Sequence, residues 1–147
     1  GDLLLSFRSI NLITIVDPQT LKVKWYSFGQ FSRQHDPDWG YNGEIILYDN
    51  QSHNISSRIL SINTKTNHVS TLIDGADLGF YQFAQGNQHY DQHGRVLFTN
   101  NAEAVQVGPE GIQFYFKYLN QKKKALDIGT VSYIDDLSYQ DWLKECR

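Results

Sequence analysis

A strand pattern that repeats three times along the chain limits the folds open to it more than any other feature. Each unit begins at a glycine (Gly1, Gly43 or Gly94) and continues with short, β-rich apolar runs separated by polar turns. The three glycines are 42 and 51 residues apart. In each unit the second run ends in a polar hairpin turn, at 17–20, 63–66 and 109–111. Repeats of roughly 40–50 residues with about four strands each are typical of β-propeller blades.

A single blade cannot bury both of its faces, so blades must stack on one another. We therefore predict an all-β chain with about three four-stranded antiparallel β-propeller blades over residues 1–136, the first entered part-way through. Leu137, Trp142 and Cys146 have weak helical spacing, and Ser138 can cap a helix there. This spacing predicts a short C-terminal helix over 137–147 that packs on the propeller rim.

Composition excludes several classes of partner. The net charge of −3 gives no electrostatic reason to bind nucleic acid or an anionic membrane surface. No apolar run approaches the ~18 residues of a membrane span, and no signal peptide is visible.

Cys146 is the only cysteine, so an intramolecular disulfide is impossible. The strand-like start at Gly1 and the absence of methionine predict that the chain is part of a longer protein.

One histidine stands out because of the stiff segment that carries it. Pro37 fixes its own φ and is expected to hold Asp36 extended, so His35 lies on a rigid loop. The loop precedes a tight turn at Asn42-Gly43 and an apolar strand over 44–48. Such a backbone can aim a side chain into a site. The alternative is a loop histidine that caps a turn or packs under a neighbouring aromatic ring.

Six short motifs occur in a fixed order over the first 60 residues. They are GDLLLSFR (1–8), NLITIVDP (11–18), KVKW (22–25), QHDPD (34–38), GEIILYDN (43–50) and SRI (57–59). Together they resemble the C-terminal half of the arylsulfate sulfotransferase (arylsulfotransferase) propeller family. The resemblance covers residues 1–75 well, continues less sharply through 94–116 and fades after about residue 120.

The resemblance implies a six-bladed propeller with its active site at the central channel. A histidine there accepts a sulfuryl group from an aryl sulfate and passes it to a phenol, with no nucleotide cofactor. By motif, His35 matches that histidine and Arg8 matches a sulfate-binding arginine. The family's other active-site histidines lie upstream of Gly1. The resemblance therefore implies either a missing N-terminal half or a homodimer that closes the ring, in the periplasm or outside the cell.

The chemistry of these residues agrees with the resemblance. A neutral imidazole is a competent nucleophile near pH 7, and the fork of donors on arginine can bind two sulfuryl oxygens. Asp36 or Asp38 can orient the ring of His35 by accepting from its second nitrogen, and Asn11 can support the same site through its amide. The plainer alternatives are that Arg8 pairs with an acid and that Asn11 is a turn residue.

Two further readings concern function and metals. The alternative function is a non-catalytic β-propeller that serves as a binding or scaffold module and has an incomplete site. His89 and His93 are spaced i, i+4, but that spacing converges on a helix, and here a turn before a strand is expected. We therefore predict no metal, and the resemblance implies no cofactor.

Overall fold

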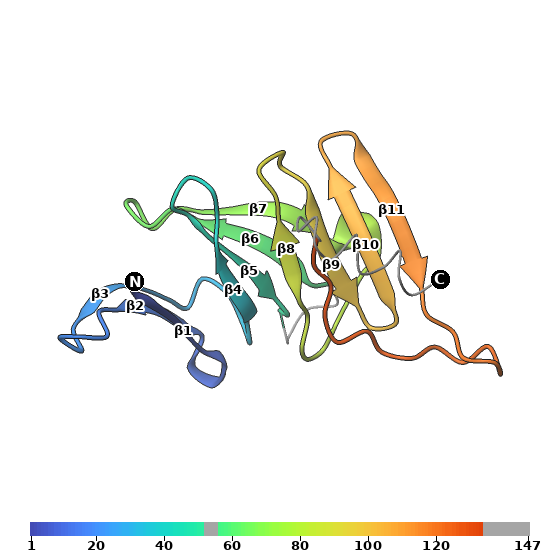
Figure 1. Cartoon of the computed structure of the whole chain (residues 1–147), viewed down its shortest axis with the longest axis horizontal. Helices are drawn as coiled ribbons and strands as arrows, with labels where there is room; N and C mark the ends of the chain where they lie inside the picture. The colour runs from blue at the N-terminus through green and yellow to red at the C-terminus, as the bar shows by residue number, and fades with distance from the viewer. Residues whose placement is uncertain (52–55, 134–147) are drawn as a thin grey trace, which may run out of the picture.

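The computed structural model describes residues 1–51 and 56–133 of the chain. Three antiparallel sheets stand side by side in chain order (Figure 1). The sheets contain β1 (Leu3–Phe7), β2 (Leu12–Val16) and β3 (Val23–Phe28); then β4 (His35–Trp39), β5 (Ile45–Asp49), β6 (Arg58–Ile62) and β7 (Val69–Asp74); then β8 (Gln88–Tyr90), β9 (Val96–Asn100), β10 (Glu103–Gly108) and β11 (Gly111–Lys117). Two short helices lie between strands, the 3-10 turn η1 (Arg8–Ile10) and α1 (Gly75–Leu78). The helix predicted over 137–147 lies outside the described residues.

The sheets have the composition expected of stacked blades. The first has three strands and the other two have four, which confirms the antiparallel blade pattern. Gly43 and Gly94 precede β5 and β9 with φ of 80° and 76°, in the left-handed region that glycine enters without a steric penalty.

Two strands lie where the sequence predicts a loop or a turn. β4 carries His35 itself, and β8 includes His89, for which the sequence predicts a turn. Both are the first strand of their sheet and pair on one side only, with β5 and β9. Polar residues and a proline are tolerated at such an edge, so neither segment has the apolar alternation that marks a strand in the sequence.

The core lies between the sheets, and β5 is its centre. All five residues of β5 are buried. Ile45 and Leu47 belong to the apolar cluster shared with the first sheet, whereas Ile46 and Tyr48 belong to the cluster shared with the third. Successive side chains of a strand point to opposite faces, so an uninterrupted apolar run is what a sheet covered on both faces requires.

Within the described residues, the outward faces of the first and third sheets are apolar and uncovered. On the first sheet, Phe7, Tyr26 and Phe28 line an open apolar groove. On the third, Phe114 and Phe116 of β11 are about half exposed. Exposed apolar patches of this kind mark contact surfaces. Among the described residues, no helix has both the length and the apolar character needed to cross a membrane.

The connections at one end of the sheets bring distant parts of the chain together. The links β1–β2, β3–β4, β5–β6 and β7–β8 all lie at the same end, because consecutive strands within each sheet are antiparallel. Arg8 follows β1, His35 begins β4, and Gln85 precedes β8. This end carries the candidate site.

Candidate functional site

His35 and Arg8 meet at this end of the sheets, although 27 residues separate them. The Nε of Arg8 donates to the Nε2 of His35 over 3.0 Å. Both side chains are partly buried. Arg8 occupies the start of η1, a turn that ends at Asn11 in the left-handed conformation with φ of 54°. The fold therefore joins the two residues that the sequence analysis placed in one site.

A second donor reaches the same nitrogen. The main-chain N–H of Gln85 donates to Nε2 of His35 over 3.2 Å. Two donors on one imidazole nitrogen fit a lone pair at that nitrogen, which corresponds to the neutral ring with its proton on Nδ1. Burial, and after it the positive charge of Arg8, lowers the pKa of His35 below its usual 6.5. The site thus holds His35 in the protonation state that a nucleophile needs.

A bulge at Asp36-Pro37 aims His35. His35 pairs with Tyr48 and Asp38 pairs with Ile46, so two residues of β4 oppose one of β5. Asp36 has φ of 49°, which is left-handed, and the prediction of an extended Asp36 is wrong. A proline disfavours helical backbone conformations of the residue that precedes it, so the backbone at Asp36 is strained. Strain of this kind persists only where surrounding contacts hold it.

The contacts that hold Asp36 come from the third sheet. Its Oδ2 accepts from Asn87 Nδ2 and from the main-chain N–H of Gln88, both over 2.7 Å. Burial raises the pKa of Asp36, and the donor from Gln88 opposes that rise. Asp38 is exposed and accepts from the N–H of Trp39. Among the described residues, neither carboxylate is hydrogen-bonded to His35. In the structure, Asp36 therefore links β4 to the start of β8 and does not orient the ring of His35.

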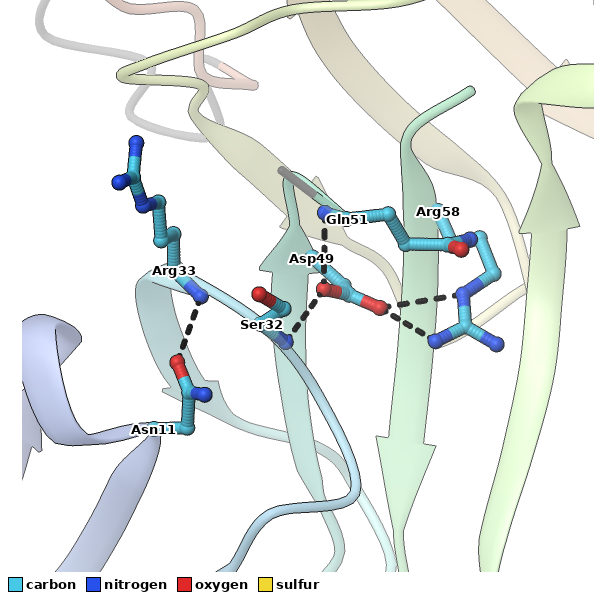
Figure 2. Close-up of polar contacts among 6 residues, drawn as sticks. All are labelled: Asn11, Ser32, Arg33, Asp49, Gln51 and Arg58. Atoms are coloured by element: carbon cyan, nitrogen blue, oxygen red, sulfur yellow. Dashed lines mark hydrogen bonds and ion pairs between the residues drawn. The ribbon is translucent and has the colours of Figure 1, made fainter. Parts of the chain in front are cut away.

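The segment that leads into β4 is fixed by side chains from both neighbouring sheets (Figure 2). Asn11 accepts from the main-chain N–H of Arg33 over 2.9 Å. Asp49, fully buried, accepts from the main-chain N–H of Ser32 over 2.8 Å and is paired with Arg58. Asn11 thus positions the backbone two residues before His35. The acceptor is its side-chain amide oxygen, Oδ1, which is therefore engaged in a contact within the protein.

Gln34 completes this anchoring from the first sheet. It is buried, and its Nε2 donates to Ser6 Oγ over 3.0 Å and to the main-chain oxygen of Leu12 over 3.1 Å. The immediate neighbours of His35 on both sides are therefore held, Gln34 by the first sheet and Asp36 by the third. A ring placed this way is pre-organised, and little conformational freedom is lost when it reacts.

Three residues near this site could not be predicted from the sequence: Gln85, Asn87 and Asn50. Gln85 contributes a main-chain group, which leaves no trace in the identity of the residue. Asn87 and Asn50 act through contacts with residues 51 and 32 or more positions away. The described residues contain no group of three or more histidine, cysteine or acidic side chains placed to hold a metal ion.

Comparison with known proteins identifies a family and a similar solved structure. Residues 1–107 match the arylsulfotransferase (ASST) family. No curated protein matches the chain. A protein of unknown function from Bacteroides caccae, solved as a crystal structure, is similar with a TM-score of 0.56 and 16% identity. The similarity covers 92% of this chain and 46% of that one, so this chain spans less than half the length of that protein.

Proposed function

Because the chain belongs to the arylsulfotransferase (ASST) family, we propose that it forms part of a propeller that transfers a sulfuryl group from an aryl sulfate to a phenol through His35. The observation that carries this proposal is the contact between Arg8 Nε and His35 Nε2 at 3.0 Å. It places a permanent cation beside a neutral imidazole nitrogen, at the end of the sheets where the chain connections converge. Family membership alone would leave the residues unassigned.

The proposed reaction has two displacement steps. In the first, the lone pair of His35 Nε2 forms a bond to sulfur while the bond from sulfur to the aryl oxygen breaks and the phenolate leaves with its electron pair. The ring keeps its Nδ1 proton and becomes a sulfurylated imidazolium. In the second step, an acceptor phenolate attacks sulfur and the N–S electron pair returns to Nε2. The acceptor proton goes to solvent or to the departed phenolate.

Arg8 serves this chemistry in two ways. Before reaction, its charge helps to keep His35 neutral, which preserves the nucleophile. As sulfur moves toward Nε2, negative charge spreads over the sulfuryl oxygens, and a guanidinium can donate to two of them at once. Asn11 and Asp36 act one step back from the substrate, by holding the backbone on either side of His35.

The two uncovered apolar faces support an assembly larger than this chain. In a six-bladed ring, further blades would cover the groove of the first sheet and the outer face of β11. Those blades come either from an N-terminal half that carries the family's other active-site histidines or from a second copy of the chain. We expect the complete protein to act in the periplasm or outside the cell, as the family resemblance implies.

Mass spectrometry of the intact protein tests the assignment of His35. The protein is incubated with 4-nitrophenyl sulfate, and the peptide that contains His35 is examined for an added sulfuryl group. We expect a label on His35 in the wild type and none in His35→Ala. His89→Ala, which changes a histidine of the neighbouring blade, should keep the label.

A wild-type protein that is folded, has a known oligomeric state and gains no label would contradict the enzymatic proposal. It would favour the second candidate function, a binding or scaffold module of the same lineage. The observation behind that candidate is the pair of open faces, which leaves the site bordered by only three sheets.

A further inference from the structure

The segment between α1 and β8 closes one side of the site and brings a main-chain donor to His35. The N–H of Gln85 lies 3.2 Å from Nε2, on the nitrogen that Arg8 also contacts. The side chain of Gln85 is exposed, and its φ of 66° is left-handed. A backbone in this uncommon conformation persists only where contacts with neighbouring residues fix the turn.

Asn50 makes the contacts that fix the turn at Gln85. Asn50 is fully buried at the end of β5, and its Nδ2 donates to the main-chain oxygens of Gln82 over 2.8 Å and of Gln85 over 2.9 Å. One amide group therefore holds both ends of the four-residue turn. Ser57 adds a second hold, because its Oγ accepts from the N–H of Gln82 over 3.0 Å.

Gly86 lets this turn lie directly on the core. It has φ of 106°, and a Cβ added there would lie 2.7 Å from the ring of Tyr48. Tyr48 is fully buried and is the residue of β5 that pairs with His35. The turn therefore rests on the same strand position that faces His35, and a side chain at residue 86 would lift it away.

We propose that the Gln85 main-chain N–H is a sulfuryl-binding donor of this site and that Asn50 is the positioning residue that aims it. Before transfer, this donor and Arg8 hold the lone pair of Nε2. Transfer to sulfur consumes that lone pair, and both donors are then free to bind the sulfuryl oxygens that replace it. The sulfuryl-binding role of the Gln85 N–H rests on the proposed function. The effect of Asn50 on the tautomer of His35 does not.

Nuclear magnetic resonance of the 15N-labelled imidazole tests the part that is independent of sulfuryl transfer. In the wild type we expect neutral His35 to carry its proton on Nδ1. In Asn50→Ala and Gly86→Ala, loss of the Gln85 donor should raise the pKa of His35 and increase the share of the Nε2–H tautomer. Gln85→Ala is the matched control, because it removes the side chain and keeps the N–H, and its spectrum should match the wild type.

Three results would overturn the positioning role. They are an Nε2–H tautomer in the wild type, an unchanged His35 in both folded turn variants, or a Gln85→Ala spectrum that changes as theirs do. Thermal melts establish that each variant is folded. The tautomer of the wild type needs no variant, so an Nε2–H tautomer there would overturn the positioning role even where a substitution prevents folding.

The rate of His35 labelling by 4-nitrophenyl sulfate tests the sulfuryl-binding role. Loss of one preorganised donor costs about 10²–10³ in rate elsewhere, so we expect at least a roughly 10-fold loss in Asn50→Ala and Gly86→Ala and none in Gln85→Ala. Labelling of both turn variants at the wild-type rate would overturn this inference and leave the proposed function standing. Failure of the wild type itself to label would instead overturn the proposed function, and with it the sulfuryl-binding role of Gln85.

Discussion

At the scale of single residues, the protonation of His35 decides whether the site can react. Burial and the charge of Arg8 both lower its pKa, so the neutral ring is favoured in the folded state. The sequence indicates both residues through motif order, and the structure brings them to 3.0 Å. The sequence gives no means of finding the Gln85 N–H, because a main-chain donor is independent of residue type and 50 positions separate it from His35.

The lowered pKa predicts the pH dependence of labelling. The rate of His35 sulfurylation should be constant above about pH 7 and fall as the pH drops through the folded-state pKa of His35, which lies below 6.5. The folded state favours the neutral ring, so protonation in this range also costs stability, which is lost as the pH falls from 6.5 through the folded-state pKa. Label incorporation measured against pH provides the test.

Replacing Arg8 should move this profile. In Arg8→Ala the rate should fall at all pH values, and its pH-dependent decline should shift to higher pH, because one of the two causes that depress the His35 pKa is gone. Arg95→Ala is the control, since Arg95 pairs with Asp91 in the turn before β9 and has no contact with His35. A profile for Arg8→Ala that coincides with the wild type would contradict the role of Arg8.

At the scale of elements, the bulge in β4 connects the stability of the fold to the placement of His35. The apolar strands, their hairpins and the turn glycines follow from the sequence, because alternation and turn chemistry are local signals. β4 and β8 do not, because edge strands that pair on one side need no apolar run. The left-handed Asp36 is also not predictable, because the donors that overcome the local preference before Pro37 come from Asn87 and Gln88.

Removal of the Asp36 carboxylate should therefore weaken the joint between the second and third sheets. We expect Asp36→Ala to lower the free energy of unfolding by about 1–3 kcal/mol, since it leaves two partly buried donors without their acceptor. Asp38→Ala, on the same strand but exposed, should change stability by less than about 0.5 kcal/mol. Urea unfolding of the three proteins measures this difference. Equal stability of the two variants would mean that the bulge is held by other contacts.

At the scale of the whole molecule, the stacking of three sheets buries β5 in the middle sheet and leaves one face of each outer sheet uncovered within the described residues. β5 is covered because apolar sheets lie on both of its faces, whereas no part of the described chain covers the outward face of the first sheet, where Phe7, Tyr26 and Phe28 line a groove. The sequence predicts this incompleteness from the repeat, because three blades cannot bury all their faces. It leaves open which chain supplies the missing blades.

The 147-residue chain on its own should therefore pair with a second copy, with the first sheet of each copy against the third sheet of the other. Sedimentation equilibrium should give twice the mass of one chain. Phe28→Glu on the first face and Phe114→Glu on the third should each return the monomer, because either substitution places a charge in both of the equivalent interfaces. Lys65→Glu, in the hairpin turn between β6 and β7, is the charge-changing control and should leave the dimer intact. A stable monomer that is insensitive to both phenylalanine substitutions would contradict the pairing of two copies and leave an N-terminal half as the source of the missing blades.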